Sequence, residues 1–131
     1  MLFRSVLANL MFDLDAVTTS TTARSGGHLL LAEVVATFGL VLVVFGALRS
    51  ERVETVAFAV GGYIAAAYWF TSSTSFANPA VTLARTLSDT FAGISPGSVP
   101  GFVLAQLVGA ALAVLVVRVL FPHPRLPQES A

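Results

Sequence analysis

The sequence contains no cysteine and no lysine, and only 11% of its 131 residues are charged. An ordinary soluble domain carries about 25% charged residues, so this chain has too few polar side chains to coat a soluble globule of its size. The lack of cysteine excludes disulfides, thiolate catalysis and cysteine-based metal sites. The two histidines, His28 and His123, lie far apart without metal-ligand spacing, so we expect no metal site.

The chain also has no excess charge of either sign, because seven arginines balance seven acidic residues. This neutrality gives no indication of a nucleic-acid partner. The sequence also lacks paired carboxylates and clustered histidines, so we expect neither enzyme activity nor a cofactor.

Apolar residues are abundant instead, at 56% of the chain. A helix needs about 20 residues, at 1.5 Å rise each, to cross a bilayer. We predict spans at about residues 29–48, 56–71 and 99–117. The second is short, but its glycine and alanine runs suit close helix packing in lipid. Tyr68 and Trp69 near its end either anchor in the membrane interface or pack between helices.

The linker from Thr71 to Pro100 is unlike an ordinary hydrophilic loop. Within it, Asn78 is a preferred helix N-cap, and Pro79 is favoured at the first helical position. We predict a helix at about 79–89, which is too short to span and is tolerated at membrane depth only when buried in protein or lining a watery cavity. The predicted fold class is therefore an all-α membrane protein with three transmembrane helices and one re-entrant half-helix.

This arrangement resembles the C-terminal half of the aquaporin, or major intrinsic protein, family. The matching residues are Asn78-Pro79-Ala80 between the second and third spans, Glu33 with Thr37 in the first span, and Gln106 with Gly109-Ala110 in the third. The resemblance implies two inverted repeats, each with three spans and one half-helix, whose Asn-Pro-Ala motifs meet near the bilayer centre. Within the family, the chain is similar to the bacterial type with an Asn-Pro-Ala-Val second motif.

The resemblance implies a division of the chain into three parts. Residues 1–27 are the tail of a preceding helix and an extracellular loop, residues 28–122 form one half repeat, and residues 123–131 are a cytoplasmic tail. The match covers only half of a family member, so we expect a piece of a longer channel; pairing with another half in inverted orientation is the alternative. Family members assemble as tetramers, which implies further protomers as partners.

Arginine counts predict the orientation of the chain in the lipid bilayer. Arg49, Arg52, Arg118 and Arg125 flank one side of the three predicted spans, against Arg4 and Arg24 on the other. We therefore predict a multi-pass protein of the cell membrane with its C-terminus in the cytoplasm.

Asn78 is the residue that we most expect to act in a pore. Its side-chain oxygen can accept from the first helical turn, which leaves its amide free to donate into a passage. The positive end of the half-helix, roughly +0.5 charge, points to the same place. A donor in a positive field orients water and disfavours cations, protons included. The alternative is a cap on an ordinary surface helix.

Glu33 lies within the first predicted span, where an unpaired carboxylate would cost about 3 kcal/mol. The resemblance implies that it accepts hydrogen bonds from backbone N–H groups of the re-entrant loop, with Thr37, one turn on, assisting. The alternative places Glu33 near the membrane interface, where water hydrates it.

The resemblance also places a selectivity constriction at Val81, Ser75 and Ala66. Family members carry an arginine directly after the second Asn-Pro-Ala, so valine here, with serine and alanine, implies a wider and less charged constriction. The alternative to Ala66 is that Tyr63 or Tyr68 fills the space.

Arg85 is a separate candidate, because it lies one helical turn beyond Val81 on the same face. One hypothesis makes it a displaced arginine at the outer mouth, where it repels cations. The other is that its side chain snorkels to lipid headgroups or water.

These residues lead to the hypothesis of passive conduction of water and small uncharged solutes, namely polyols such as glycerol and metalloid acids such as arsenous acid. A wide constriction favours solutes over strict water selectivity, and the bacterial members with the Asn-Pro-Ala-Val motif are often linked with arsenic handling. Two alternatives remain. One is half of a coupled secondary transporter, with Glu33 as its ionisable group; the other is a non-conducting membrane assembly subunit.

Overall fold

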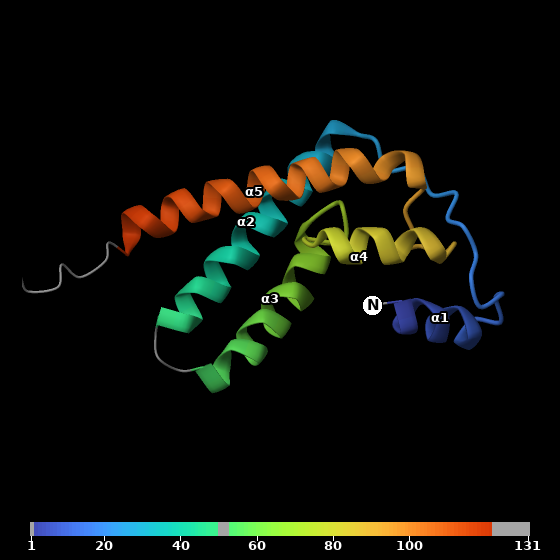
Figure 1. Ribbon diagram of the computed structural model, residues 1–131, viewed down its shortest axis with the longest axis horizontal. Helices are drawn as coiled ribbons and strands as arrows, with labels where there is room; N and C mark the ends of the chain where they lie inside the picture. Colours follow the sequence, from blue (N-terminus) through green and yellow to red (C-terminus); the bar gives the residue numbers. More distant parts are fainter. Residues whose placement is uncertain (1, 50–52, 122–131) are drawn as a thin grey trace, which may run out of the picture.

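The computed structural model describes residues 2–49 and 53–121, and every regular element in these residues is a helix (Figure 1). In chain order the elements are α1 (Leu2–Met11), α2 (Gly27–Arg49), η1 (Val53–Thr55), α3 (Val56–Phe70), α4 (Pro79–Ala84), η2 (Arg85–Leu87), η3 (Pro96–Ser98) and α5 (Val99–Leu120), where η denotes a 3₁₀ helix. The predicted all-α class is confirmed. The predicted tail 123–131, together with Arg52 and Arg125, lies outside the described residues.

Two helices are long enough to cross a membrane by themselves. α2 has 23 residues, and α5 together with η3 has 25. At 1.5 Å rise per residue, α2 is about 34 Å long, against a hydrocarbon core of about 30 Å. Both helices are strongly apolar along their length. They correspond to the spans predicted at 29–48 and 99–117, and the later one continues to Leu120.

α3 is shorter than the span predicted at 56–71. Its 15 residues amount to about 22 Å of α-helix, which is less than the hydrocarbon thickness. The helix ends at Phe70 because Thr71 is extended (φ −103°, ψ 133°), although the N–H of Thr71 still donates to the O of Ala67. Two of the three predicted spans therefore reach spanning length, and the third does not reach it alone.

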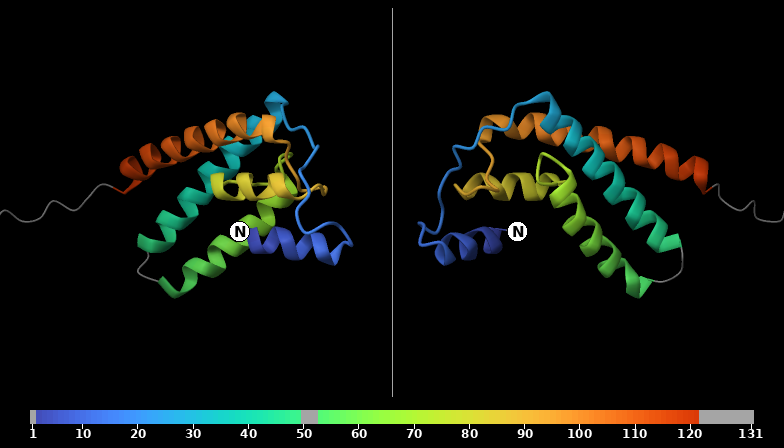
Figure 2. Two further views of the ribbon diagram at one scale, coloured as in Figure 1. Left: turned by 45° about the vertical axis from the view of Figure 1, so that its right-hand side comes forward. Right: turned by 180° about the vertical axis from the view of Figure 1, so that it is seen from behind.

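α2 and α5 lie side by side and form the most extensive helix contact (Figures 1 and 2). A Cβ added to Gly109 of α5 would clash with the O of Val34 and lie 3.1 Å from the Cβ of Thr37, both on α2. Small residues are common at such contacts, because lipid supplies no hydrophobic drive for helix association. The pair is therefore held by close backbone approach.

α3 packs on α2 through Tyr63. The Tyr63 hydroxyl donates to the O of Ala36 at 3.0 Å, and its ring lies where a Cβ on Gly39 would otherwise stand. Gly39 is thus needed at this position because of close side-chain approach. Tyr63 is consequently committed to the contact between the two helices.

α4 and η2 together form the half-helix, which lies between α5 and α1 (Figures 1 and 2). The helix predicted at 79–89 ends at Leu87, since Ser88 is extended (φ −142°, ψ 109°). The O of Leu87 accepts from the side chain of Asn9 and from the N–H of Thr18. Hydrogen bonds from α1 and from the loop that follows α1 therefore take the place of another turn of the half-helix.

Candidate functional site

Glu33 is fully buried in α2, and its carboxylate accepts four hydrogen bonds. The donors are the Oγ of Ser73 (2.6 Å), the N–H of Phe76 (2.9 Å), the N–H of Ala77 (2.9 Å) and the Nε2 of Gln106 (2.7 Å). The first three belong to the segment 71–78, which we call the pore loop. A buried carboxylate is tolerated when donors satisfy it in this way. The conformation of the pore loop therefore supplies three of the four donors that the buried charge of Glu33 needs.

The backbone of the pore loop is strained. Thr74, Ser75 and Ala77 have φ values of 64°, 51° and 50°, a region that costs a non-glycine residue roughly 1–2 kcal/mol. This conformation turns two consecutive N–H groups, those of Phe76 and Ala77, toward the two oxygens of Glu33. The hydrogen bonds to Glu33 therefore offset the strain and hold the loop in shape.

Asn78 caps the half-helix from an extended backbone conformation (φ −159°, ψ 124°), and Pro79 follows at the first helical position. Its Oδ1 accepts from the N–H of Ala80 at 2.8 Å and from the N–H of Val81 at 3.4 Å. Because the oxygen is engaged by the helix, the Nδ2 amide is left to donate outward. Asn78, Pro79 and Ala80 are all exposed.

Gln106 of α5 joins the half-helix to Glu33. Its Nε2 donates both to Glu33 and to the Oγ1 of Thr82, at 2.7 and 2.8 Å. Thr82 in turn donates to the O of Asn78 at 3.0 Å. One buried chain of hydrogen bonds therefore runs from α2 through α5 to the start of the half-helix.

The far end of the half-helix is held by α1. The Oγ of Ser5 donates to the O of Ala84 at 3.2 Å, and the Nδ2 of Asn9 donates to the O of Leu87 at 3.1 Å. Asn9 is fully buried and also accepts from the Oγ of Ser88 at 2.6 Å. This role of α1 was not predicted from the sequence, although Ser5 and Asn9 are polar residues in an apolar segment. They lie four positions apart and hence on one helical face.

In the sequence, Arg24 served only to predict the orientation of the chain in the membrane, as a positive charge on the outer side. In the structure its side chain is buried. Its Nε, Nη2 and Nη1 donate to the carbonyl oxygens of Gly93 (2.7 Å), Phe91 (2.7 Å) and Ser73 (3.1 Å). Its backbone N–H donates to the Oγ of Ser98 at 3.0 Å. Burial lowers the pKa of Arg24, but arginine stays charged at any ordinary pH. No sequence pattern indicated these contacts.

A cavity of about 370 Å³ opens beside the start of the half-helix. Its walls are Leu40, Val60, Ile64, Ser75, Phe76, Asn78, Val81 and Arg85. Four of the residues singled out in the sequence, Asn78, Val81, Ser75 and Arg85, are therefore brought together at one place. The Oγ of Ser75 is buried and has no hydrogen-bond partner within the described part of the chain.

Ala66 does not line this cavity. It lies two residues beyond Ile64, hence about 200° around α3 from it, while Val60 and Ile64 are among the lining residues. Tyr63 does not fill the space either, because its ring packs against Gly39. Tyr68 packs edge-on against Trp69, with 6.0 Å between the ring centroids.

Thr37 does not assist Glu33 by hydrogen bonding. Its hydroxyl is buried and has no partner in residues 2–49 and 53–121. Its Cβ instead faces Gly109 across the contact of α2 with α5. The loop-supporting role of Thr37 stays a prediction, and the structure shows its side chain at the close contact of the two helices.

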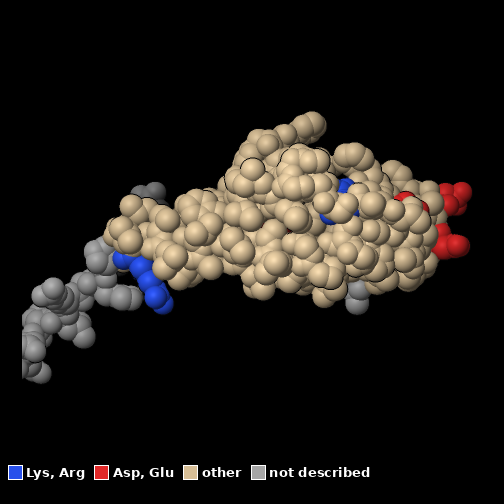
Figure 3. Space-filling view, turned by 90° about the horizontal axis from the view of Figure 1, so that it is seen from above, with Lys and Arg blue, Asp and Glu red and all other residues tan. Residues whose placement is uncertain are grey.

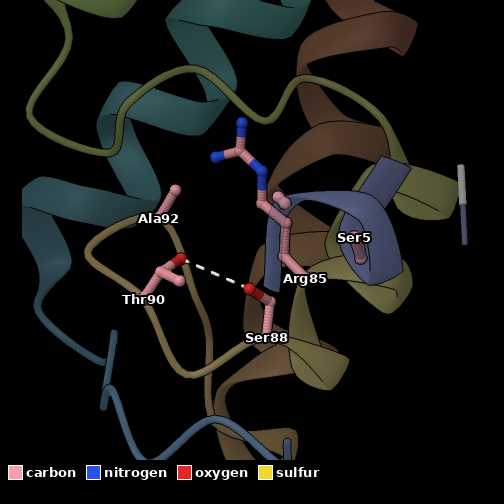
Figure 4. A pocket seen from close by; sticks show the side chains of 6 residues that line it. Ser5, Arg85, Ser88, Thr90 and Ala92 are labelled. Carbon is pink, nitrogen blue, oxygen red and sulfur yellow. Dashed lines mark hydrogen bonds between the residues drawn. The ribbon is translucent and has the colours of Figure 1, made fainter. Parts of the chain in front are cut away.

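Arg85 borders the cavity and extends toward the pore loop (Figure 4). Its guanidinium carbon lies 4.2 Å from the centroid of the Phe76 ring, and its Nη1 lies 3.4 Å from the Oγ1 of Thr74. Figure 4 shows a second cavity, of about 180 Å³, which Arg85 lines together with Ser88 and Thr90. The side chain is half-buried and directed at the loop.

Comparison with known proteins agrees with this geometry. The Major intrinsic protein family matches residues 48–130. Aquaglyceroporin AqpS of Rhizobium meliloti (strain 1021) is 51% identical over 121 residues, which are 92% of this chain and 52% of that protein. The chain thus spans about half the length of the curated relative that it matches. No solved structure matches significantly.

Members of this family are integral membrane channels rather than enzymes. The two spanning helices, the buried carboxylate beneath a re-entrant loop and the asparagine-capped half-helix fit a part of such a channel. From the matched family and the relative together, the chain belongs to the major intrinsic protein family.

Proposed function

We propose that the complete channel containing this chain conducts water and small uncharged solutes passively, with glycerol-like polyols as its main solutes. The observation that supports the proposal is the cavity beside the half-helix, in which the Asn78 amide and the Arg85 guanidinium stand among uncharged walls. Both groups have N–H hydrogens that are free to donate, and neither has a free acceptor atom. Such donors suit solutes that offer hydroxyl oxygens.

The remaining walls favour a solute with a carbon skeleton. Leu40, Val60, Ile64 and Val81 present apolar surface to the cavity, and a polyol can place its CH groups there while its hydroxyls contact the donors. The matched relative is named an aquaglyceroporin, which supports polyols as the class. We extend the proposal to arsenous acid, which is also neutral and carries three hydroxyl groups.

We propose that the end of the molecule with the helix C-termini faces the cytoplasm. Arg49 and Arg118 lie in the last turns of α2 and α5. Figure 3 shows basic side chains at this end of the molecule and acidic side chains gathered at the opposite end. Cytoplasmic loops of membrane proteins carry excess arginine and lysine. The cavity has one half-helix, so we further propose that a second half of the same fold closes it.

Stopped-flow swelling of proteoliposomes tests the proposal on the complete channel. We expect glycerol, and separately arsenous acid, to enter several-fold faster than into protein-free liposomes. Ile64→Trp would fill the cavity and slow glycerol entry, whereas Ala66→Trp, on another face of α3, would leave it near the unaltered rate. Glycerol entry no faster than in protein-free liposomes would overturn the proposed function. If only Ala66→Trp slowed glycerol entry, Ala66 rather than Ile64 would face the solute in the constriction.

A further inference from the structure

Arg24 bridges the two arms of the segment that carries the half-helix. Its guanidinium donates to Ser73 in the arm before the half-helix, and to Phe91 and Gly93 in the arm after it. All three acceptors are backbone carbonyls, which point wherever the chain conformation sends them. An arginine fork that engages three of them fixes the arms relative to each other.

Arg24 and Arg85 share one aromatic neighbour. The guanidinium carbons of Arg24 and Arg85 lie 5.1 and 4.2 Å from the centroid of the Phe76 ring. Both distances fall within the roughly 6 Å at which a cation is attracted to a ring face. Phe76 is itself 2% exposed and packs on Phe102 at 5.3 Å between centroids. The ring therefore forms a rigid support for two positive charges.

The charges around the cavity are unbalanced. Apart from Arg85, the lining residues are uncharged, and the guanidinium carbon of Arg24 lies 5.1 Å from the ring centroid of Phe76, which is one of them. The carboxylate of Glu33 interacts electrostatically with both arginines. Its two oxygens, however, already accept hydrogen bonds from four donors of the pore loop and α5. A buried charge is screened less than an exposed one, so the charge of Arg24 acts over several ångströms.

We propose that Arg24 is a specificity-determining residue of the channel: together with Arg85 across Phe76, it supplies the positive field that excludes cations at the outer mouth. Arg24 also positions Arg85, because it holds the loop to which Arg85 is directed. Neutral solutes do not respond to this field, so glycerol passage depends little on it. The inference rests on the proposed channel function and adds a residue from the loop between α1 and α2.

The test compares potassium leak with glycerol swelling in proteoliposomes of the complete channel. Arg24→Gln removes the charge and should raise the ratio of potassium leak to glycerol entry, measured per assembled channel, about tenfold. Arg24→Lys keeps the charge but lacks the fork, so it should raise the leak by only about threefold. If Arg24→Gln fails to assemble, Arg24→Lys carries the test.

Arg49→Gln is the matched control. Arg49 also donates to a backbone carbonyl, the O of Phe121 at 2.7 Å, and lies 5.1 Å from an aromatic centroid, but at the other end of the molecule. It should leave the leak unchanged. A wild-type leak in assembled Arg24→Gln or Arg24→Lys channels would overturn the inference. A lower yield of channel protein with an unchanged leak per channel would also overturn it, because Arg24 would then serve folding alone. Glycerol entry in the unaltered channel separately tests the proposed function, so either can fail without the other.

Discussion

The segment that carries the half-helix and the pair of long helices are stabilised in different ways. Residues 71–98 are held by buried polar side chains from elsewhere in the chain, namely Glu33, Arg24 and Asn9. α2 and α5 instead approach closely at small residues such as Gly109. A long helix satisfies its own backbone groups, whereas a loop at membrane depth needs partners from the protein. The proposed function is therefore assigned to the region whose backbone depends on other elements.

Removing the carboxylate beneath the pore loop should have the largest effect. Glu33→Ala leaves the N–H groups of Phe76 and Ala77 buried without acceptors and releases a strained loop, which should cost about 3 kcal/mol or more. Thermal unfolding in detergent and glycerol swelling should both show the loss. Glu33→Gln keeps one oxygen and should lose less. Wild-type stability and flux in Glu33→Ala would show that the loop holds its shape without this residue.

A substitution at the α2–α5 contact should have an intermediate effect. In Gly109→Ala the new Cβ meets the backbone O of Val34, so the helices must separate, at about 1–3 kcal/mol. Gly46→Ala on α2 is the control, since a Cβ there meets nothing within 4 Å and should stabilise the helix by up to about 1 kcal/mol. Equal unfolding temperatures for the two variants would contradict close backbone approach as the basis of this contact.

The smallest effect is expected where a buried hydroxyl has no partner. Thr37→Val exchanges an unpaired hydroxyl for a methyl group and should change stability by at most about 0.5 kcal/mol, or raise it. Thr82→Val makes the same exchange at a hydroxyl bonded to Asn78 and Gln106, and should cost about 1–2 kcal/mol. A larger loss for Thr37→Val than for Thr82→Val would reverse our assignment of the two threonines.

The sequence indicated the helical class, the position of the half-helix and four residues of the cavity, because hydrophobic runs, an Asn-Pro start and a motif are local signals. It also singled out Glu33, whose contacts with Phe76 and Ala77 are now described. It missed the contacts of Asn9 and Arg24, since both side chains donate to carbonyls about 50 to 80 positions away. A role of Ala66 in the constriction stays a prediction; the cavity is lined by Val60 and Ile64 of α3, because rotation around the helix decides which side chains reach it.

The central claim is that Asn78 begins a helix inside the membrane and faces a narrow aqueous passage. The described sequence has no cysteine, so Asn78→Cys in a complete channel without other cysteines provides one thiol, and Asp15→Cys in the exposed loop serves as its control. A small neutral methanethiosulfonate should label both positions, while a polymer-linked maleimide should label only position 15. Equal labelling of position 78 by the bulky reagent would place Asn78 on an open surface and contradict the account.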